Sequence, residues 1–117
     1  MAGKRTMVNI PGMAHGAPIP MGSKIGNMVY SSGISGGNPE THSMPPDPDE
    51  QADQLFKNIR SFMEQAGGTP DDIIHMRLLM KDDKYRDSIN KAWLKMFPDE
   101  NNRPARHAIT TELGHAR

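Results

Sequence analysis

The chain contains no cysteine, and this absence removes several kinds of chemistry at once. Disulfides, thiolate nucleophiles and zinc sites built on thiolates are excluded, and the composition suits a reducing compartment. Long apolar runs are also missing: none approaches the roughly 18 residues of a membrane-spanning helix, and the N-terminus has no apolar secretory signal. We therefore expect a cytoplasmic protein that makes no use of a membrane.

Net charge and aromatic side chains are likewise scarce. The 14 basic and 14 acidic residues cancel, and the longest basic run is Lys4-Arg5. Since nucleic-acid binding depends on a clustered basic surface, we expect no nucleic-acid partner. Aromatic residues make up 5% of a chain whose hydrophobic fraction is 35%. This is a small supply for the core of a monomer, and oligomerisation would supplement it.

The length of 117 residues fits a single domain, 1–117, which begins with extended segments. Strands are predicted at 5–10 and 23–33, and Gly26-Asn27 inside the second segment is typical of a hairpin turn. The loops that follow these segments are rich in proline and glycine and cover 11–22 and 33–48.

The rest of the chain alternates between helical and extended patterns. Apolar side chains at spacings of three and four predict a helix over 49–66, ended by Gly67-Gly68, and a second helix over 83–97. Strands are predicted over 73–80 and 105–112. The residues on the dry face of the first of these strands are Ile74, Met76, Leu78 and Met80.

The order ββαβαβ predicts an α+β sandwich in which two helices pack on one face of a mixed β-sheet. The second face of the 73–80 strand is half apolar, so we expect a neighbouring subunit to cover the sheet there. Acidic residues crowd the start of the first helix, where the helix dipole favours them, and we assign them a structural role: Asp47, Asp49, Glu50 and Asp53.

Four segments carry a pattern that is recognisable as a set. They are Gly26-Asn27-Met28-Val29-Tyr30-Ser31-Ser32-Gly33, Ala66-Gly67-Gly68, Ser88-Ile89-Asn90-Lys91 and Arg103-Pro104-Ala105-Arg106. In this order the chain resembles the RidA/YjgF family, formerly described as the endoribonuclease L-PSP family. The likeness runs over 16–112 and is most specific where Pro-Ala-Arg enters the last strand.

The resemblance implies a chorismate-mutase-like fold and a trimeric barrel, a homotrimer with its sites between subunits. It also implies a hydrolase that needs no cofactor. Members of this family convert reactive enamine and imine acids, such as 2-aminoacrylate, 2-iminobutanoate and 2-iminopropanoate, to 2-ketoacids and ammonia. The implied partner is thus a small substrate that bears a carboxylate.

The resemblance also implies the residues of a site. Arg106 falls on the arginine that holds the substrate carboxylate, and a planar guanidinium suits a bidentate carboxylate better than lysine does. Asn90 and Ser32 fall on residues that line the same pocket, and Gly33 allows the backbone to approach a ligand. Arg106 and Asn90 are the predicted catalytic residues, and both also contact the substrate. The other predicted substrate contacts are Ser32, Gly33, Ile19 and Ala108.

The chain departs from the family at three places near that site. Ile19 stands where the family has a tyrosine, and Ala108 stands where it has a cysteine. The backbone carbonyl of Ala108 can still orient a water molecule. The family's glutamate lies on a further strand, which we expect to be missing or clipped because the chain ends at Arg117. Glu112 cannot replace it, since six residues of strand separate it from Arg106 by about 20 Å.

Two other functions remain open. A non-catalytic, regulatory protein that binds small carboxylates would tolerate the missing tyrosine and glutamate. An endoribonuclease or translation inhibitor, a role attributed to some relatives, has least support because no basic surface is predicted. The histidines show no short ligand spacing, so no metal site is predicted from His15, His42, His75, His107 or His115.

Overall fold

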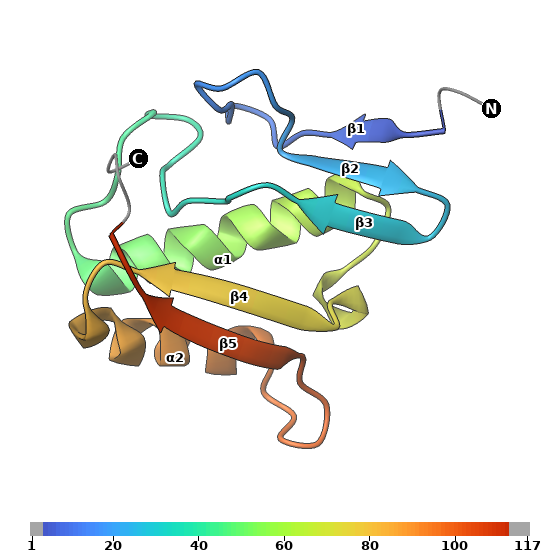
Figure 1. The fold of residues 1–117 in the computed structure, drawn as a ribbon. Coiled ribbons are helices and arrows are strands. Elements are labelled where there is room, and N and C mark those ends of the chain that lie inside the picture. The colour runs from blue at the N-terminus through green and yellow to red at the C-terminus, as the bar shows by residue number, and fades with distance from the viewer. Residues whose placement is uncertain (1–3, 113–117) are drawn as a thin grey trace.

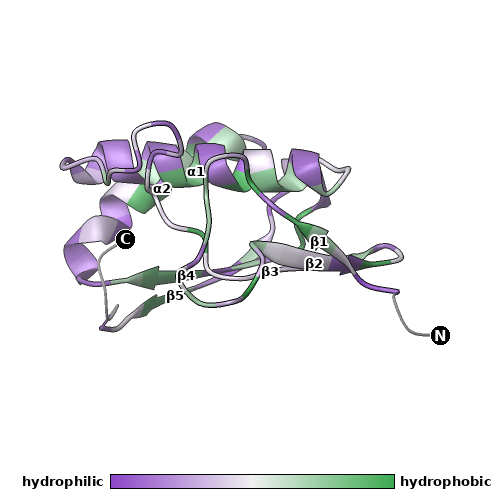
Figure 2. Cartoon of the chain, turned by 90° about the horizontal axis from the view of Figure 1, so that it is seen from above, coloured by the Kyte–Doolittle hydropathy of each residue, from purple (hydrophilic) through white to green (hydrophobic). Residues whose placement is uncertain are grey.

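The computed structural model of the protein describes residues 4–112 and arranges them as two layers (Figure 1). Both helices lie on one side of the strands, as the view along the layers shows (Figure 2). The predicted α+β sandwich is therefore confirmed. The elements are β1 (Thr6–Val8), β2 (Gly22–Ile25), β3 (Met28–Ser31), α1 (Pro48–Gln65), the 3₁₀ turn η1 (Pro70–Asp72), β4 (His75–Met80), the 3₁₀ turn η2 (Asp83–Tyr85), α2 (Arg86–Met96) and β5 (Ala105–Thr110).

The strands form an antiparallel and a parallel group. The first has the order β1-β2-β3, and the second pairs β4 with β5; within residues 4–112 no ladder joins the two groups. The predicted order ββαβαβ was one strand short, because the 23–33 segment folds into two strands. These turn at Gly26, whose φ of 58° suits a hairpin, as the Gly26-Asn27 pair predicted.

Helix α1 begins and ends where its sequence signals lie. Asp47 caps it by accepting a hydrogen bond from the backbone of Glu50 at 3.1 Å, and Pro48 occupies the first turn, where its missing N–H has no intrahelical partner. Gly67 follows with a φ of 90°, a left-handed conformation that favours glycine and ends the helix. Among residues 4–112, neither helix is long and apolar enough to cross a membrane.

Two clusters of buried side chains form the core, and α1 contributes to both. One cluster lies between the helices and β4, and its α1 members are Ala52, Phe56 and Ile59. The other lies under the antiparallel group, with Phe62 from α1 and Ala66 at the C-cap of that helix. A Cβ atom at Gly22 would clash with the Phe62 ring, so the helix approaches β2 only because that position is glycine.

The buried face of β4 differs from the prediction at one residue. Met76, Leu78 and Met80 are buried against the helices as predicted, whereas Ile74 is 86% exposed. The strand begins at His75, so the alternation of faces does not extend back to Ile74, and Ile73 packs against the core in its place. The physical cause is the capped η1 turn. It ends at Asp72, so Ile73 and Ile74 form the short link between this turn and β4.

A buried amide attaches the long 32–47 connection to α1. Asn58 is 2% exposed, and its Nδ2 donates to the carbonyl oxygens of Ser35 and Gly37, both at 2.8 Å. Its Oδ1 accepts a hydrogen bond from Gln54 at 2.9 Å. These bonds satisfy carbonyl groups that a proline- and glycine-rich connection cannot pair within itself.

Polar contacts also join α1 to α2. The Ser88 hydroxyl donates to Asp49 Oδ1 at 2.5 Å, and Lys91 Nζ lies 3.0 Å from Asp49 Oδ2. The hydrogen bond from Ser88 and then the contacts with Lys91 lower the pKa of the Asp49 carboxyl below its usual value. Asp49 therefore joins the two helices, because its carboxylate on α1 binds Ser88 and Lys91 on α2.

The lowered pKa of Asp49 predicts a pH-dependent contribution to stability. A carboxyl whose pKa is lower in the folded state stabilises the fold above its unfolded pKa, and that contribution is lost as the pH falls below about 4. Asp49→Asn should therefore lower the melting temperature near neutral pH, and the difference from the wild type should shrink in acid. Thermal unfolding across this pH range measures it.

The matched control is Asp53→Asn, since Asp53 contacts Lys95 at 3.4 Å and has no hydroxyl donor among the described residues. We expect a smaller difference for this variant. A difference for Asp49→Asn that stays constant from neutral to acid pH would contradict the assignment.

Candidate functional site

The site is organised around Arg106 on β5. In the parallel pairing Met76 lies opposite Arg106, and parallel partners direct their side chains to the same face of the sheet. Arg106 therefore shares the face of Met76, which the helices cover, and is half-buried. His107, the next residue, is exposed on the other face, as the alternation of the strand predicts.

Helix α2 supplies two contacts that hold the Arg106 guanidinium. Its Nη2 donates to Asn90 Oδ1 at 2.7 Å, and its Cζ lies 5.0 Å from the centre of the Trp93 ring. Burial, and secondarily the positive charge of Arg86, lowers the pKa of Arg106 from its usual value. The guanidinium keeps its charge at neutral pH, because its ordinary pKa lies far above 7.

The hydrogen bond with Asn90 leaves part of the guanidinium available. A guanidinium has two edges on which a carboxylate can bind with two bonds, and the two edges share Nη2. One bond to Asn90 uses one of the two Nη2 hydrogens, so the other edge stays complete. Within residues 4–112, Nε and Nη1 of Arg106 have no hydrogen-bond partner. The geometry thus allows an anion such as a carboxylate to bind the free edge of Arg106 through two hydrogen bonds.

Ala108 lies two residues further along β5 and is half-buried on the face of Arg106. The backbone N–H groups of Ala105 and Thr111 donate to Ile74 and Met80, so odd-numbered residues bond to β4. In a parallel pair the backbone N–H and C=O groups of the intervening residues, here the even-numbered ones, point away from the partner strand. The carbonyl of Ala108 is therefore directed to the edge of β5 that carries no strand among the described residues.

The remaining predicted residues gather at the end of β3. Ser32 donates its hydroxyl proton to the Pro20 carbonyl at 2.9 Å, and its backbone N–H to Met21 at 2.7 Å. Ile19, next to Pro20, is 48% exposed. Gly33 is exposed, with open space where a Cβ would lie. Ser32 was predicted as a pocket donor, but here its proton is already used.

The structure thus brings the predicted residues together in two groups. Arg106, Asn90 and Ala108 lie on β5 and α2, while Ser32, Gly33 and Ile19 lie around the end of β3. No hydrogen bond joins the two groups in the part of the chain that is described. The predicted absence of the family's last strand concerns residues after Glu112, and these, like His115, lie outside the described residues.

Two residues of this region were not predicted to have a role in it. The predicted helix over 83–97 includes Trp93, but no function was assigned to it, although it lies three residues after Asn90 and hence on the same side of α2. Arg103 belongs to the quoted Arg-Pro-Ala-Arg segment, but no function was assigned to it. The spacing from Asn90 was the available signal for Trp93.

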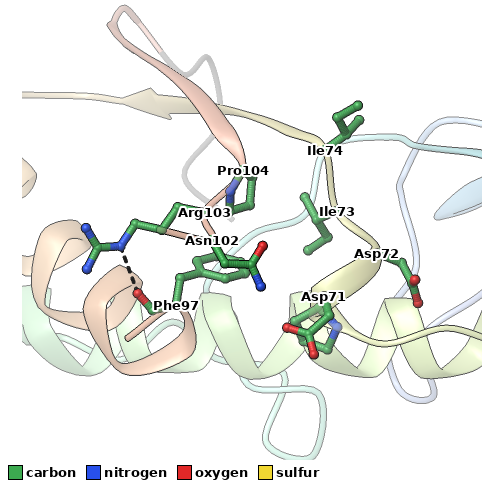
Figure 3. Close-up of a pocket in the computed structure, with 9 residues that line it drawn as sticks. Asp71, Asp72, Ile73, Ile74, Phe97, Asn102, Arg103 and Pro104 are labelled. Atoms are coloured by element: carbon green, nitrogen blue, oxygen red, sulfur yellow. Dashed lines mark hydrogen bonds between the residues drawn. The ribbon is translucent and has the colours of Figure 1, made fainter. Parts of the chain in front are cut away.

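Arg103 lines a separate open hollow of about 290 Å³ at the beginning of β4 and β5 (Figure 3). Its guanidinium points away from Asp71 and Asp72, and its Nε donates to the carbonyl of Phe97 at 2.9 Å. Arg103 therefore binds the carbonyls of Phe97 and Pro98, just past α2, and attaches the connection before β5 to that end of the helix. In residues 4–112 no three potential metal ligands converge.

Comparisons with known proteins show which family model and which relatives the chain matches. The family model described as "Endoribonuclease L-PSP" matches residues 17–113. The chain is 31% identical over 93 residues to the 2-iminobutanoate/2-iminopropanoate deaminase of Escherichia coli K12, covering 79% of this chain and 73% of that protein. It is 30% identical over 98 residues to a RutC family protein of Aquifex aeolicus, covering 80% and 78% of the two chains.

A solved structure shows the same similarity in three dimensions. The crystal structure of RidA from the Antarctic bacterium Psychrobacter sp. PAMC 21119 superposes with a TM-score of 0.82 and 28% identity. The match covers 91% of this chain and 85% of that one.

The geometry predicts that Arg106 binds small carboxylates through its planar fork. Breaking a charge pair of this kind costs on the order of 2 to 5 kcal/mol, so Arg106→Ala should weaken binding of pyruvate or 2-oxobutanoate by roughly 30-fold or more. Arg106→Lys should recover little of the affinity, because a lysine keeps the charge but not the planar pair of donors. Calorimetric titration gives the affinities.

Arg60→Ala is the control, since Arg60 is exposed on α1 and its removal changes the net charge equally. It should bind as the wild type does. Equal affinities for the wild type and a folded Arg106→Ala protein would remove Arg106 from the site.

Proposed function

Because the chain belongs to the endoribonuclease L-PSP family, also known as the RidA/YjgF family, we propose that it is a cofactor-independent deaminase. Its substrates are small enamine and imine acids of the 2-aminoacrylate type, and its products are 2-ketoacids and ammonia. The observation that carries the proposal is the charged Arg106 fork, fixed by Asn90 and left with a complete bidentate edge. We place the reaction in the cytoplasm.

The proposed reaction needs positioning more than chemical groups from the protein. Arg106 binds the carboxylate, and the enamine takes a proton at its methylene carbon to give the imine. Water then adds to the imine carbon, the C–N bond breaks, and ammonia leaves as the carbonyl forms. The Ala108 carbonyl, directed to the open edge of β5, is placed to accept a hydrogen bond from that water.

The assay of this function couples the protein to a threonine or serine dehydratase, which releases 2-aminoacrylate or its homologue in situ. The rate of ketoacid release should rise when the protein is added. It should return to the uncatalysed rate with Arg106→Ala, because the substrate is then no longer held at its carboxylate. Ketoacid release that is unchanged by the wild-type protein would exclude the deaminase.

A second candidate is a non-catalytic protein that binds small carboxylates. Ile19 and Ala108 favour it, since neither side chain can transfer a proton or hold a water molecule. The two functions separate in the same pair of experiments. A protein that binds 2-oxobutanoate in calorimetry without accelerating ketoacid release is a binding protein.

We also propose that the working form is a homotrimer with its sites between subunits. The helices cover only one face of the strands (Figure 2). By the strand register, large exposed apolar side chains lie on the other face. An isolated chain rarely leaves such a face to water. A neighbouring chain would cover this face, and by extending past the free edge of β5 it would bring a second group of pocket residues to Arg106 on the other face. The exposed residues of this face are Met7, Ile25, Met28, Tyr30 and Leu79.

Sedimentation should therefore show one species of three times the 13.0 kDa chain mass. Tyr30→Glu should dissociate it, because Tyr30 is 73% exposed in the single chain and a carboxylate would be buried without a partner. Leu94→Glu is the matched control: Leu94 is 51% exposed on α2, in the other layer. A wild-type monomer, or equal behaviour of the two variants, would contradict the proposed interface.

A further inference from the structure

Trp93 occupies an unusual position between the core and the site. It is 7% exposed and belongs to the cluster between the helices and β4. The centre of its ring nevertheless lies 5.0 Å from Arg106 Cζ, within the range in which a cation is attracted to an aromatic face. A core side chain thus forms the surface on which the guanidinium rests.

The orientation of the Trp93 ring is itself held. Phe97, four residues on at the C-cap of α2, packs against it with ring centres 4.8 Å apart and an interplanar angle of 61°. This is the edge-to-face geometry that aromatic pairs prefer. Phe97 is buried, and Arg103 binds its carbonyl. The ring under Arg106 therefore has little freedom to turn.

We propose that Trp93 is a positioning residue for the carboxylate grip of Arg106. The inference rests on the proposed function only to the extent that Arg106 binds a carboxylate. Trp93 fixes the height and tilt of the guanidinium through its face, and Asn90 fixes the rotation of the guanidinium in its own plane through the Nη2 bond. With both contacts made, the free edge is presented in one direction before any ligand arrives.

Substitution by residues with and without a π face tests this role. Trp93→Phe keeps an aromatic face and should bind 2-oxobutanoate within a few-fold of the wild type. Trp93→Leu keeps an apolar side chain but removes the face, and should weaken binding by about 3- to 30-fold, the range expected of a cation–π contact. The control Phe56→Leu removes a buried ring from the same cluster and should bind as the wild type does.

The protein also offers a spectroscopic measurement of this contact. Trp93 is the only tryptophan of the chain, so tryptophan emission reports on its surroundings alone. Emission should change as 2-oxobutanoate is titrated, because the ligand neutralises the charge above the ring. The midpoint of this change should agree with the dissociation constant measured by calorimetry. Arg106→Ala should abolish the change and alter the starting spectrum.

The outcomes divide cleanly. Equal affinity of Trp93→Leu and the wild type, or constant emission during a titration in which calorimetry detects binding, overturns the inference. So does a wild-type protein that binds no 2-oxo acid, since there is then no grip to position. A protein that binds as described but hydrolyses no imine refutes the deaminase alone and leaves the role of Trp93 intact.

Discussion

The parallel register of β4 and β5 is the constraint on which the candidate site depends. Because Met76 lies opposite Arg106, the arginine shares the face that the helices cover and meets α2. A shift of one residue would turn Arg106 to the open face and place His107 beside α2 instead. The register is held by the Ala105 and Thr111 hydrogen bonds to β4, and Arg103 attaches the preceding connection to the end of α2.

Given this register, a single helix supplies the contacts that hold the guanidinium. Asn90 and Trp93 lie along one side of α2, Phe97 is at the C-cap of this helix, and the first two contact Arg106. An arginine free in solvent loses rotamer entropy of up to about 2 kcal/mol when it is immobilised by a ligand. In this protein folding has already restricted those rotamers. For the proposed carboxylate site, the packing of α2 therefore matters as much as the position of β5.

The sequence predicted most of the fold because its strongest signals are local. The apolar spacing, Asp47 and Gly67 locate α1 to within a residue at either end, and Gly26-Asn27 locates the hairpin. Ile74 was predicted on the buried face because the alternation of the strand was extended back to residues that precede it. The η1 turn just before these residues is held by capping hydrogen bonds, which the apolar pattern does not record. The contact of Trp93 with Arg106 was missed because it depends on how β5 packs against α2, which no local pattern records. The bond of Ser32 to Pro20 likewise joins residues that only the folded hairpin brings together.

The shared position of α1 has a consequence for how the chain opens. The two buried clusters meet along this helix and at the half-buried Ile34, which packs against both, and among residues 4–112 no strand ladder joins one half to the other. Each half can therefore open locally while α1 stays packed against the remaining one. Amide hydrogens of β2 and of β4 should then exchange with solvent at independent rates, and those of α1 should exchange last. The half that carries Arg106 forms one such unit, so a ligand bound there would slow exchange in β4, β5 and α2 while leaving the antiparallel strands nearly unchanged.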